Sequence, residues 1–382
     1  MEHTERKLST AQLACIIFIL GMSLKLLILP ILLIKSSGRD ATLSFAALLT
    51  LDLIMLAVMI AAIVLAPEKS FTELLEGMIG KWAAKVVYIV LVVYFFFKLA
   101  LLSGDVQMFF SEELLPDLQW TLYCMPFFAM CAIIGVGTAR SIGRTAQIIA
   151  VIVGVAIIMT FVLICVGVDF SLLLPINAGG LKKVPTDLCR YAMWYGDFTV
   201  LTVFMGSIKR TKKTYALGIT AGIISAVFVM FFAVSLIASF ADIADIIRFG
   251  QNVSGLSLDA IGNEQQGRFD LVLFCVWLFA LFLKAGIFTF GVVHFTTATV
   301  PKLDAHKGWI GLVIAVLLFV TSRLATQNTA LHAFMISYAA IPALIIQSVV
   351  PVLTLIASLV GRHKQNKGCS AVVKPKNAEG DL

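Results

Sequence analysis

Ten apolar stretches, separated by polar segments, constrain the fold of this chain more than any other feature. A helix needs about 20 apolar residues to cross the hydrocarbon core of a bilayer, because each residue adds about 1.5 Å. The stretches cover residues 12–34, 41–65, 85–106, 121–138, 145–168, 190–208, 215–240, 270–293, 308–326 and 331–360. The sequence therefore predicts an all-α polytopic membrane protein with ten transmembrane helices.

The composition leaves no room for a soluble domain of useful size. Apolar residues make up 60% of the 382 positions and charged residues only 13%, with a mean hydropathy of +0.99. We expect one ten-helix transmembrane domain over residues 1–361 and a basic, disordered cytoplasmic tail over 362–382. The longer connections predict an interfacial helix within 67–84 and a partly helical surface flap within 241–269.

The basic residues of the connecting segments are distributed unequally between the two sides of the membrane. Counted over alternate connections, 18 Lys and Arg lie on the side of both termini and 8 on the opposite side. Cytoplasmic loops carry the excess of Lys and Arg, so we expect both termini to be cytoplasmic. Three further lysines, Lys25, Lys98 and Lys284, fall inside apolar stretches.

The first apolar stretch is interrupted at its centre. Gly21 and Ser23 weaken the helix, Lys25 adds a charge near mid-membrane, and Pro30 removes a backbone donor. Irregular backbone at membrane depth is tolerated where it is buried in protein or lines a cavity, and such breaks mark the substrate site of many transporters. The alternative is a simple kink with a lysine that reaches the interface.

The sixth stretch carries a similar interruption, Gly196 followed by Asp197. Ten spans divide into five plus five, and these two breaks fall in the first span of each half. Corresponding broken segments in two halves point to an inverted repeat with its binding site at the breaks. We therefore expect repeats over about 10–168 and 190–360.

Four charges inside the apolar stretches are candidates for function: Lys25, Lys98, Asp197 and Lys284. Each costs at least about 2.5–3.5 kcal/mol at a span centre, so such residues face the protein interior and have partners. We expect Asp197 to pair with Lys25 across the breaks. The alternative is a purely structural ion pair, and a pair between Lys98 and Asp52 would serve packing equally well.

The sequence predicts no enzyme. It contains no Ser/His/Asp, Cys/His or paired-carboxylate constellation, and only five histidines are present. The seven cysteines have no metal-binding spacing, so neither a metal site nor a cofactor is expected.

Several short motifs resemble one membrane-protein family. They are Leu29-Pro30, Leu174-Pro-Ile-Asn-Ala-Gly-Gly180, Tyr195-Gly-Asp-Phe198 and Gly267-Arg-Phe-Asp-Leu-Val-Leu-Phe-Cys-Val-Trp277. Together they resemble the spore germination permeases, the B subunits of GerA-type germinant receptors. This family belongs to the amino acid–polyamine–organocation superfamily, so the resemblance implies the LeuT-type fold with helices 1 and 6 broken.

The resemblance also implies a central site lined by spans 1, 3, 6 and 8. The residues that would bind substrate there are Gly21, Ser23, Lys25, Lys98, Gly196, Asp197 and Lys284. Lys284 can stand where other members of the superfamily hold a coupling sodium. Span 1 departs from the family, because Ser23 and Lys25 occupy the place of closely spaced small residues whose amides face a substrate carboxylate.

The function implied is that of a membrane subunit of an endospore germinant receptor, which binds a small nutrient, an amino acid, and triggers germination. Its expected partners are an A-type membrane subunit and a C-type lipoprotein, in the inner spore membrane or cell membrane of an endospore-forming bacterium. Two alternatives stay open. One is a secondary amino acid transporter coupled to protons or sodium, and the other is an ion-channel or scaffold subunit with a vestigial pocket.

Overall fold

The computed structural model describes residues 7–23, 25, 28–66, 68–109, 120–165, 181–211, 213–239, 269–328, 334 and 338–372. Over these ranges the chain is helical, apart from an isolated parallel bridge between Leu8 and Ile208. The motif at 174–180, the expected flap at 241–268 and residues 373–382 lie outside the described residues.

The α-helices are α1 (Thr10–Met22), α2 (Ile28–Ser37), α3 (Ala41–Leu65), α4 (Phe71–Ile79), α5 (Lys81–Phe109), α6 (Trp120–Gly135), α7 (Ala139–Cys165), α8 (Val184–Arg190), α9 (Lys213–Ser239), α12 (Phe269–Thr299), α13 (Lys307–Gln327) and α15 (Ala340–Val372). The 3₁₀ segments are η1 (Gly38–Asp40), η4 (Leu181–Lys183), η5 (Ala192–Trp194), η6 (Asp197–Ser207) and η7 (Pro301–His306).

Seven helices of the described chain are long and apolar enough to cross a membrane: α3, α5, α7, α9, α12, α13 and α15. They coincide with seven of the ten predicted spans. The helix expected between the second and third spans is α4. It begins with a capping box formed by Ser70 and Glu73. The all-helical, membrane-spanning class predicted from the sequence is therefore confirmed.

The other three predicted spans differ from single long helices. The first is divided into α1 and α2, the fourth is the 16-residue helix α6, and the sixth consists of η5 and η6. Gly21 lies just before the end of α1, Pro126 lies inside α6, and Gly196 with a positive φ lies between η5 and η6.

The last helix differs from its predicted limits. It begins at Ala340 rather than 331 and continues to Val372, so the first part of the expected disordered tail is helical. The polar residues that follow Gly361 include Arg, Lys and Gln, which favour helix, and cations are stabilised near a helix C-terminus.

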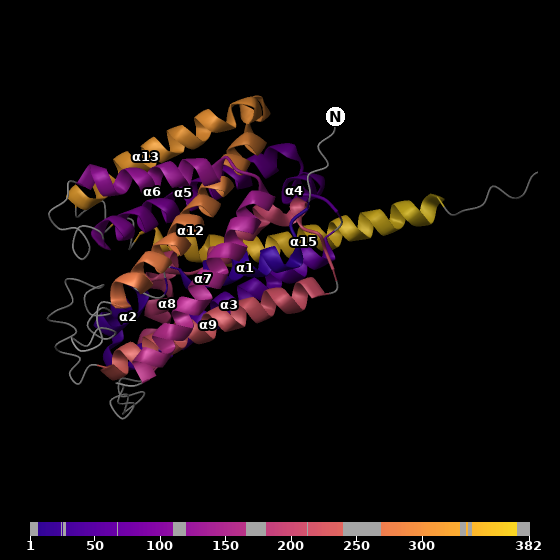
Figure 1. The fold of residues 1–382 in the computed structure, drawn as a ribbon. Helices are drawn as coiled ribbons and strands as arrows, with labels where there is room; N and C mark the ends of the chain where they lie inside the picture. Colours follow the sequence, from indigo (N-terminus) through magenta and orange to yellow (C-terminus); the bar gives the residue numbers. More distant parts are fainter. Residues whose placement is uncertain are drawn as a thin grey trace, which may run out of the picture.

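Helix α12 forms the centre of the bundle and packs on α5, α6 and α7 (Figure 1). In its most apolar 18-residue stretch, 78% of the residues are buried, whereas the share is at most 56% in the other long helices. Helix α1 packs on α9 and α7, and α3 packs on α15 and α9. Helix α7 is the least buried of the seven long helices, and its apolar side chains Ile148, Val151 and Val155 are exposed. Exposed apolar rows of this kind suit contact with lipid rather than water.

Segments far apart in the sequence meet at one end of the bundle. Lys7 forms an ion pair with Glu68 at 3.0 Å, and Arg210 donates to the carbonyl of Ala66. Lys364 of α15 donates to the carbonyl of Gly77 of α4 at 2.7 Å. These contacts bring together the two terminal segments and the connections at 66–85 and 209–213. The distribution of Lys and Arg places the same four segments on one side of the membrane.

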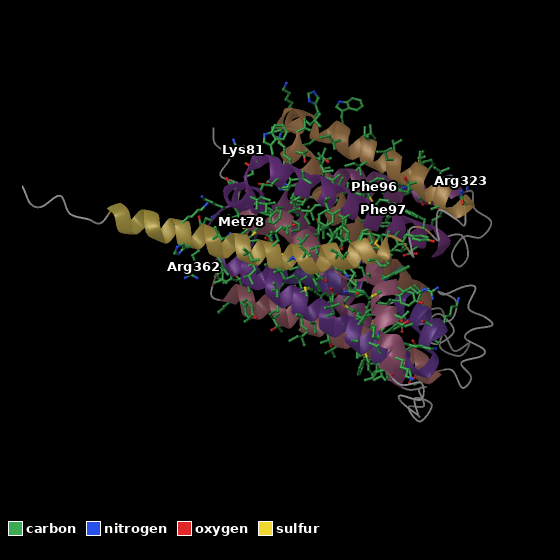
Figure 2. The ribbon with its side chains drawn as sticks, turned by 180° about the vertical axis from the view of Figure 1, so that it is seen from behind. Met78, Lys81, Phe96, Phe97, Arg323 and Arg362 are labelled. Carbon is green, nitrogen blue, oxygen red and sulfur yellow. The ribbon has the colours of Figure 1, made fainter. Side chains whose placement is uncertain are left out.

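Charged side chains mark both ends of the bundle, and apolar ones lie between them (Figure 2). Lys81 and Arg362 lie at the end where α4 and α15 meet, whereas Arg323 of α13 lies at the opposite end. Phe96 and Phe97 of α5 lie between them. This distribution is expected of helices whose middle portions are in hydrocarbon.

Candidate functional site

The first candidate element is the break between α1 and α2. Helix α1 ends at Met22, where Ser23 caps it by donating its N–H to the carbonyl of Ile19. The carbonyl of Ser23 accepts a hydrogen bond from the indole Nε1 of Trp277 on α12. Helix ends leave backbone groups without partners, and at membrane depth each must find one within the protein. Trp277 satisfies one such group and fixes the break against the central helix.

Gly21, the next-to-last residue of α1, has a packing role. A Cβ at this position would overlap the side chain of Ser225 on α9. Only glycine therefore lets α1 and α9 approach this closely, and the same contact leaves Gly21 buried.

The second candidate element is the break between η5 and η6. Gly196 has a positive φ of 78° there, and a Cβ would overlap the side chain of Gln347 on α15. The following segment is 3₁₀ over eleven residues, although such runs are usually short. The hydroxyls of Thr199 and Thr202 donate to carbonyls three residues earlier, and local bonds of this kind compete with α-helix.

Asp197 follows the second break and is the centre of a buried ion cluster. Its Oδ1 lies 2.8 Å from Lys98 Nζ on α5, and its Oδ2 lies 2.8 Å from Lys284 Nζ on α12. All three side chains are at most 3% exposed. Lys98 also donates to the carbonyl of Tyr195. The structure thus brings together three of the four charges that the sequence singled out.

The fourth charge, Lys25, has a different partner from the one expected. Its Nζ pairs with Oδ2 of Asp52 on α3, and the pair is buried. Oδ1 of the same carboxylate accepts the N–H of Gly196 at 3.0 Å. The expected Lys25–Asp197 pair is therefore wrong, because α3 places a carboxylate between the two breaks. Lys25 also lies 5.2 Å from the centroid of the Phe198 ring.

The paired side chains do not balance in charge. Lys25, Lys98 and Lys284 contribute three ammonium groups, whereas Asp52 and Asp197 contribute two carboxylates. A third carboxylate, Asp105 on α5, is buried, and its Oδ2 has no hydrogen-bond partner among the described residues. It interacts electrostatically with Lys284. An ammonium group at this depth needs an anion beside it, so the three lysines favour anionic groups in the cluster.

Sequence reasoning missed a third polar cluster. Asp187 of α8 accepts hydrogen bonds from Ser36, Ser37 and Ser44, at 2.6, 2.5 and 2.5 Å. These bonds attach α8 to the end of α2 and to α3. Asp187 lies in the connection before the sixth span, where a carboxylate gives no sequence signal of burial.

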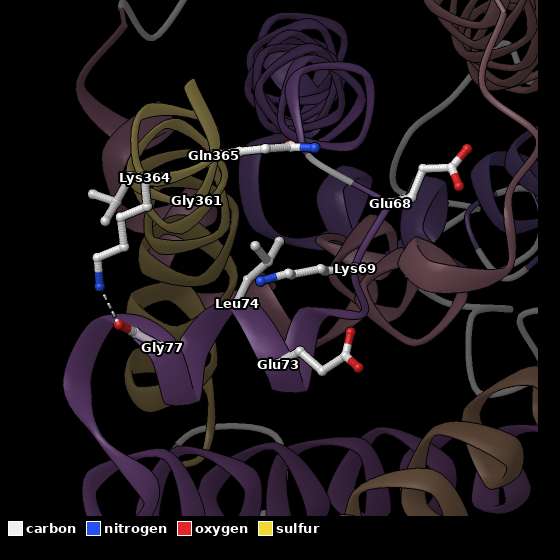
Figure 3. Close-up of a pocket in the computed structure, with 9 residues that line it drawn as sticks. Glu68, Lys69, Glu73, Leu74, Gly77, Gly361, Lys364 and Gln365 are labelled. Atoms are coloured by element: carbon white, nitrogen blue, oxygen red, sulfur yellow. Dashed lines mark hydrogen bonds between the residues drawn. The ribbon is translucent and has the colours of Figure 1, made fainter. Parts of the chain in front are cut away.

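A separate cavity of about 350 Å³ lies between α4 and α15 (Figure 3). Its lining is mostly charged or polar and comprises Glu68, Lys69, Glu73, Leu74, Gly77, Val360, Gly361, Lys364 and Gln365. The Lys7 ammonium, which bonds Glu68, holds the pKa of that carboxyl below its usual value. None of the site residues expected from the sequence lines this cavity.

Within the part of the chain that the structure describes, no three His, Cys, Asp or Glu side chains are grouped so that they could hold a metal ion. At the two breaks the structure shows ion pairing and hydrogen bonding, with ammonium groups, the Trp277 indole and the Gly196 amide as donors and with carboxylates and backbone carbonyls as acceptors.

Comparison with known families gives one match over most of the chain. A family model described as spore germination protein matches residues 7–330, which include both breaks and all the paired charges. No curated protein matches the chain.

Proposed function

The chain belongs to the spore germination protein family, and from this premise we propose that it is the membrane subunit of an endospore germinant receptor. In this proposal a small nutrient, an amino acid, binds where the two chain breaks meet. Its higher affinity for one of two conformations shifts the receptor toward the state that triggers germination.

The observation that carries the proposal is the buried ion network at the breaks. Five charged side chains, four from helical segments and Lys25 from the break between α1 and α2, converge there, and each is almost completely buried. Ionisable residues inside a membrane protein are costly and usually mark a ligand or ion path. A network that served packing alone would not need two interruptions of the helical backbone beside it.

We further propose the ten-span architecture with two inverted repeats of five spans, as in the LeuT-type fold of the wider superfamily. Support comes from the position of the breaks, one in the first span of each half. Lys7 and Lys364, near opposite termini, both contact the connection between α3 and α5. The start and end of the bundle thus lie at one end, which an even number of spans requires. The excess of Lys and Arg assigns that end to the cytoplasm.

An amino acid suits the chemistry of this site. Its carboxylate would face the lysines, which exceed the carboxylates that pair with them. The receptor would also contain an A-type membrane subunit and a C-type lipoprotein, and would lie in the inner membrane of the spore. The charges of the network pair with one another, so a nutrient must compete with these pairs, and we expect weak binding and no concentrative uptake.

Reconstitution separates a receptor from a transporter. Spores that carry the chain together with both partner subunits should germinate in response to an amino acid, whereas spores that lack either partner should not. In proteoliposomes the chain alone should not accumulate amino acids. Accumulation driven by an imposed proton or sodium gradient, and abolished by Lys284→Ala, would contradict the receptor and identify a transporter.

A further inference from the structure

We infer that Lys25 and the amide of Gly196 form a carboxylate-binding site whose resident occupant is the side chain of Asp52. A ligand carboxylate enters this site by exchange with Asp52. This inference rests on the proposed function only in assuming that a ligand reaches the breaks, and it names the chemical class of that ligand: molecules with a free carboxylate.

The two oxygens of Asp52 connect the two breaks. One accepts the N–H of Gly196 at 3.0 Å, and the other pairs with the ammonium of Lys25. Each break therefore contributes one donor to a single carboxylate that comes from a third element, α3. A bidentate carboxylate held by a cation and a backbone amide is the geometry in which a free carboxylate also binds strongly.

The backbone conformation at Gly196 leaves its N–H free to donate to Asp52. Its φ of 78° is a conformation that residues with a side chain rarely adopt. A Cβ would also meet the Gln347 side chain, so the position admits only glycine. The same conformation leaves the N–H of Gly196 outside any helical hydrogen bond, and Asp52 is its acceptor.

Charge balance restricts what can replace Asp52. Both oxygens of Asp197 are already engaged by Lys98 and Lys284, so Lys25 depends on Asp52 for its counter-ion. If Asp52 leaves, an anion must take its place, because an unpaired ammonium at this depth is strongly unfavourable. A carboxylate satisfies both donors, whereas an amide, an ester or an amine does not.

Exchange would also release Asp52 from the breaks. Its helix, α3, packs on α15, α9, η6 and α8. A shift of α3 on release is therefore transmitted to both the last long helix and the segment that follows the second break. This gives the bound carboxylate a route to change the arrangement of the bundle.

The experiment uses the purified full-length chain in detergent with sodium formate as the probe. Asp52→Ala removes the resident carboxylate and leaves a space of that size beside both donors. We expect saturating formate to raise the thermal unfolding midpoint of Asp52→Ala by about 2–4 °C relative to sodium chloride of equal concentration. Formamide, which has the same shape without the charge, should not raise it.

Three controls make the result specific. Wild type should show a smaller shift that needs a higher formate concentration, because formate must first displace Asp52 from the two donors. Asp105→Ala, which removes another buried carboxylate that forms no ion pair with a lysine of the described residues, should not respond. The double variant Lys25→Met/Asp52→Ala should have lost the response. No shift in Asp52→Ala, or an equal shift in wild type or in Asp105→Ala, would overturn the inference.

Asp52→Ala can fail to survive extraction in sodium chloride. In that case either formate or formamide is added from solubilisation onward, and the yield of monodisperse protein is measured. Recovery with formate alone supports the site, and equal yields in both overturn it. Neither measurement involves spores, partner subunits or an amino acid. A failure of the proposed receptor function would therefore leave these results unchanged, and their failure would not disprove the receptor.

Discussion

Lys25 pairs with Asp52, and the same carboxylate accepts the amide of Gly196. The two chain breaks consequently meet at α3, and Asp197 is left to bind Lys98 and Lys284. The charges at the breaks thus form two clusters rather than one chain, and each cluster can be tested separately.

The pair of Lys25 and Asp52 should show strong energetic coupling. Removing one partner of a buried pair leaves an uncompensated charge and costs about 3–5 kcal/mol, so Lys25→Met and Asp52→Asn should each destabilise the protein strongly. The double variant should lose at least about 1 kcal/mol less than the sum. Unfolding of the four proteins in a double-mutant cycle measures this. A larger coupling of Lys25 to Asp197 than to Asp52 would contradict the pairing.

Substitutions in the cluster around Asp197 should destabilise the protein by different amounts. Asp197→Asn leaves two ammonium groups without a counter-ion, whereas Lys98→Met leaves Asp197 paired with Lys284. Asp197→Asn should therefore lower the free energy of unfolding more than Lys98→Met does, by at least about 1 kcal/mol. Equal losses in thermal unfolding would indicate that the two lysines do not share this carboxylate.

Gly196→Ala should be much more damaging than a substitution at another glycine with positive φ. Gly38 has a φ of 61° but open space where a Cβ would lie, whereas a Cβ at Gly196 meets Gln347. Gly38→Ala should cost about 1 kcal/mol through its backbone conformation alone. Gly196→Ala should exceed this by at least about 1 kcal/mol because of the overlap. Similar unfolding midpoints for the two variants would argue against the close approach of α15.

Sidedness can be measured by labelling single cysteines in a cysteine-free background. Lys209→Cys and Lys364→Cys should react with a membrane-impermeant thiol reagent from the cytoplasmic side only. Arg323→Cys, at the opposite end of the bundle, should react only from outside. Labelling of Lys209→Cys and Arg323→Cys from the same side would overturn the proposed topology.

Much of the architecture follows from the sequence, because apolar length is a direct consequence of bilayer thickness. This is why α3, α5 and α12 lie where they were predicted. The first break was also predictable, since Gly21, Ser23 and Lys25 together disfavour a continuous apolar helix. The charges inside the spans were expected to turn inward, and Lys98, Asp197 and Lys284 do so in one cluster.

The pairing of those charges was not predictable, because it depends on which helices lie side by side. Asp52 is 27 residues from Lys25 and 144 from Gly196, yet it binds both. The serine bonds to Asp187 likewise depend on tertiary contacts. Periodicity and spacing carry no information on such contacts.

The proposed function requires that the ion network at the two breaks is the nutrient-sensing site. The most direct test is the amino acid concentration that gives half-maximal germination, measured as the fall in optical density of spores that carry the complete receptor. Asp197→Asn is compared with Asp304→Asn, which removes an exposed ion pair with Lys307, at equal amounts of receptor in the spore membrane. A nutrient-sensing role of Asp197 predicts at least a tenfold rise in this concentration, or no response, for Asp197→Asn and no change for Asp304→Asn. An unchanged response of Asp197→Asn spores would contradict it.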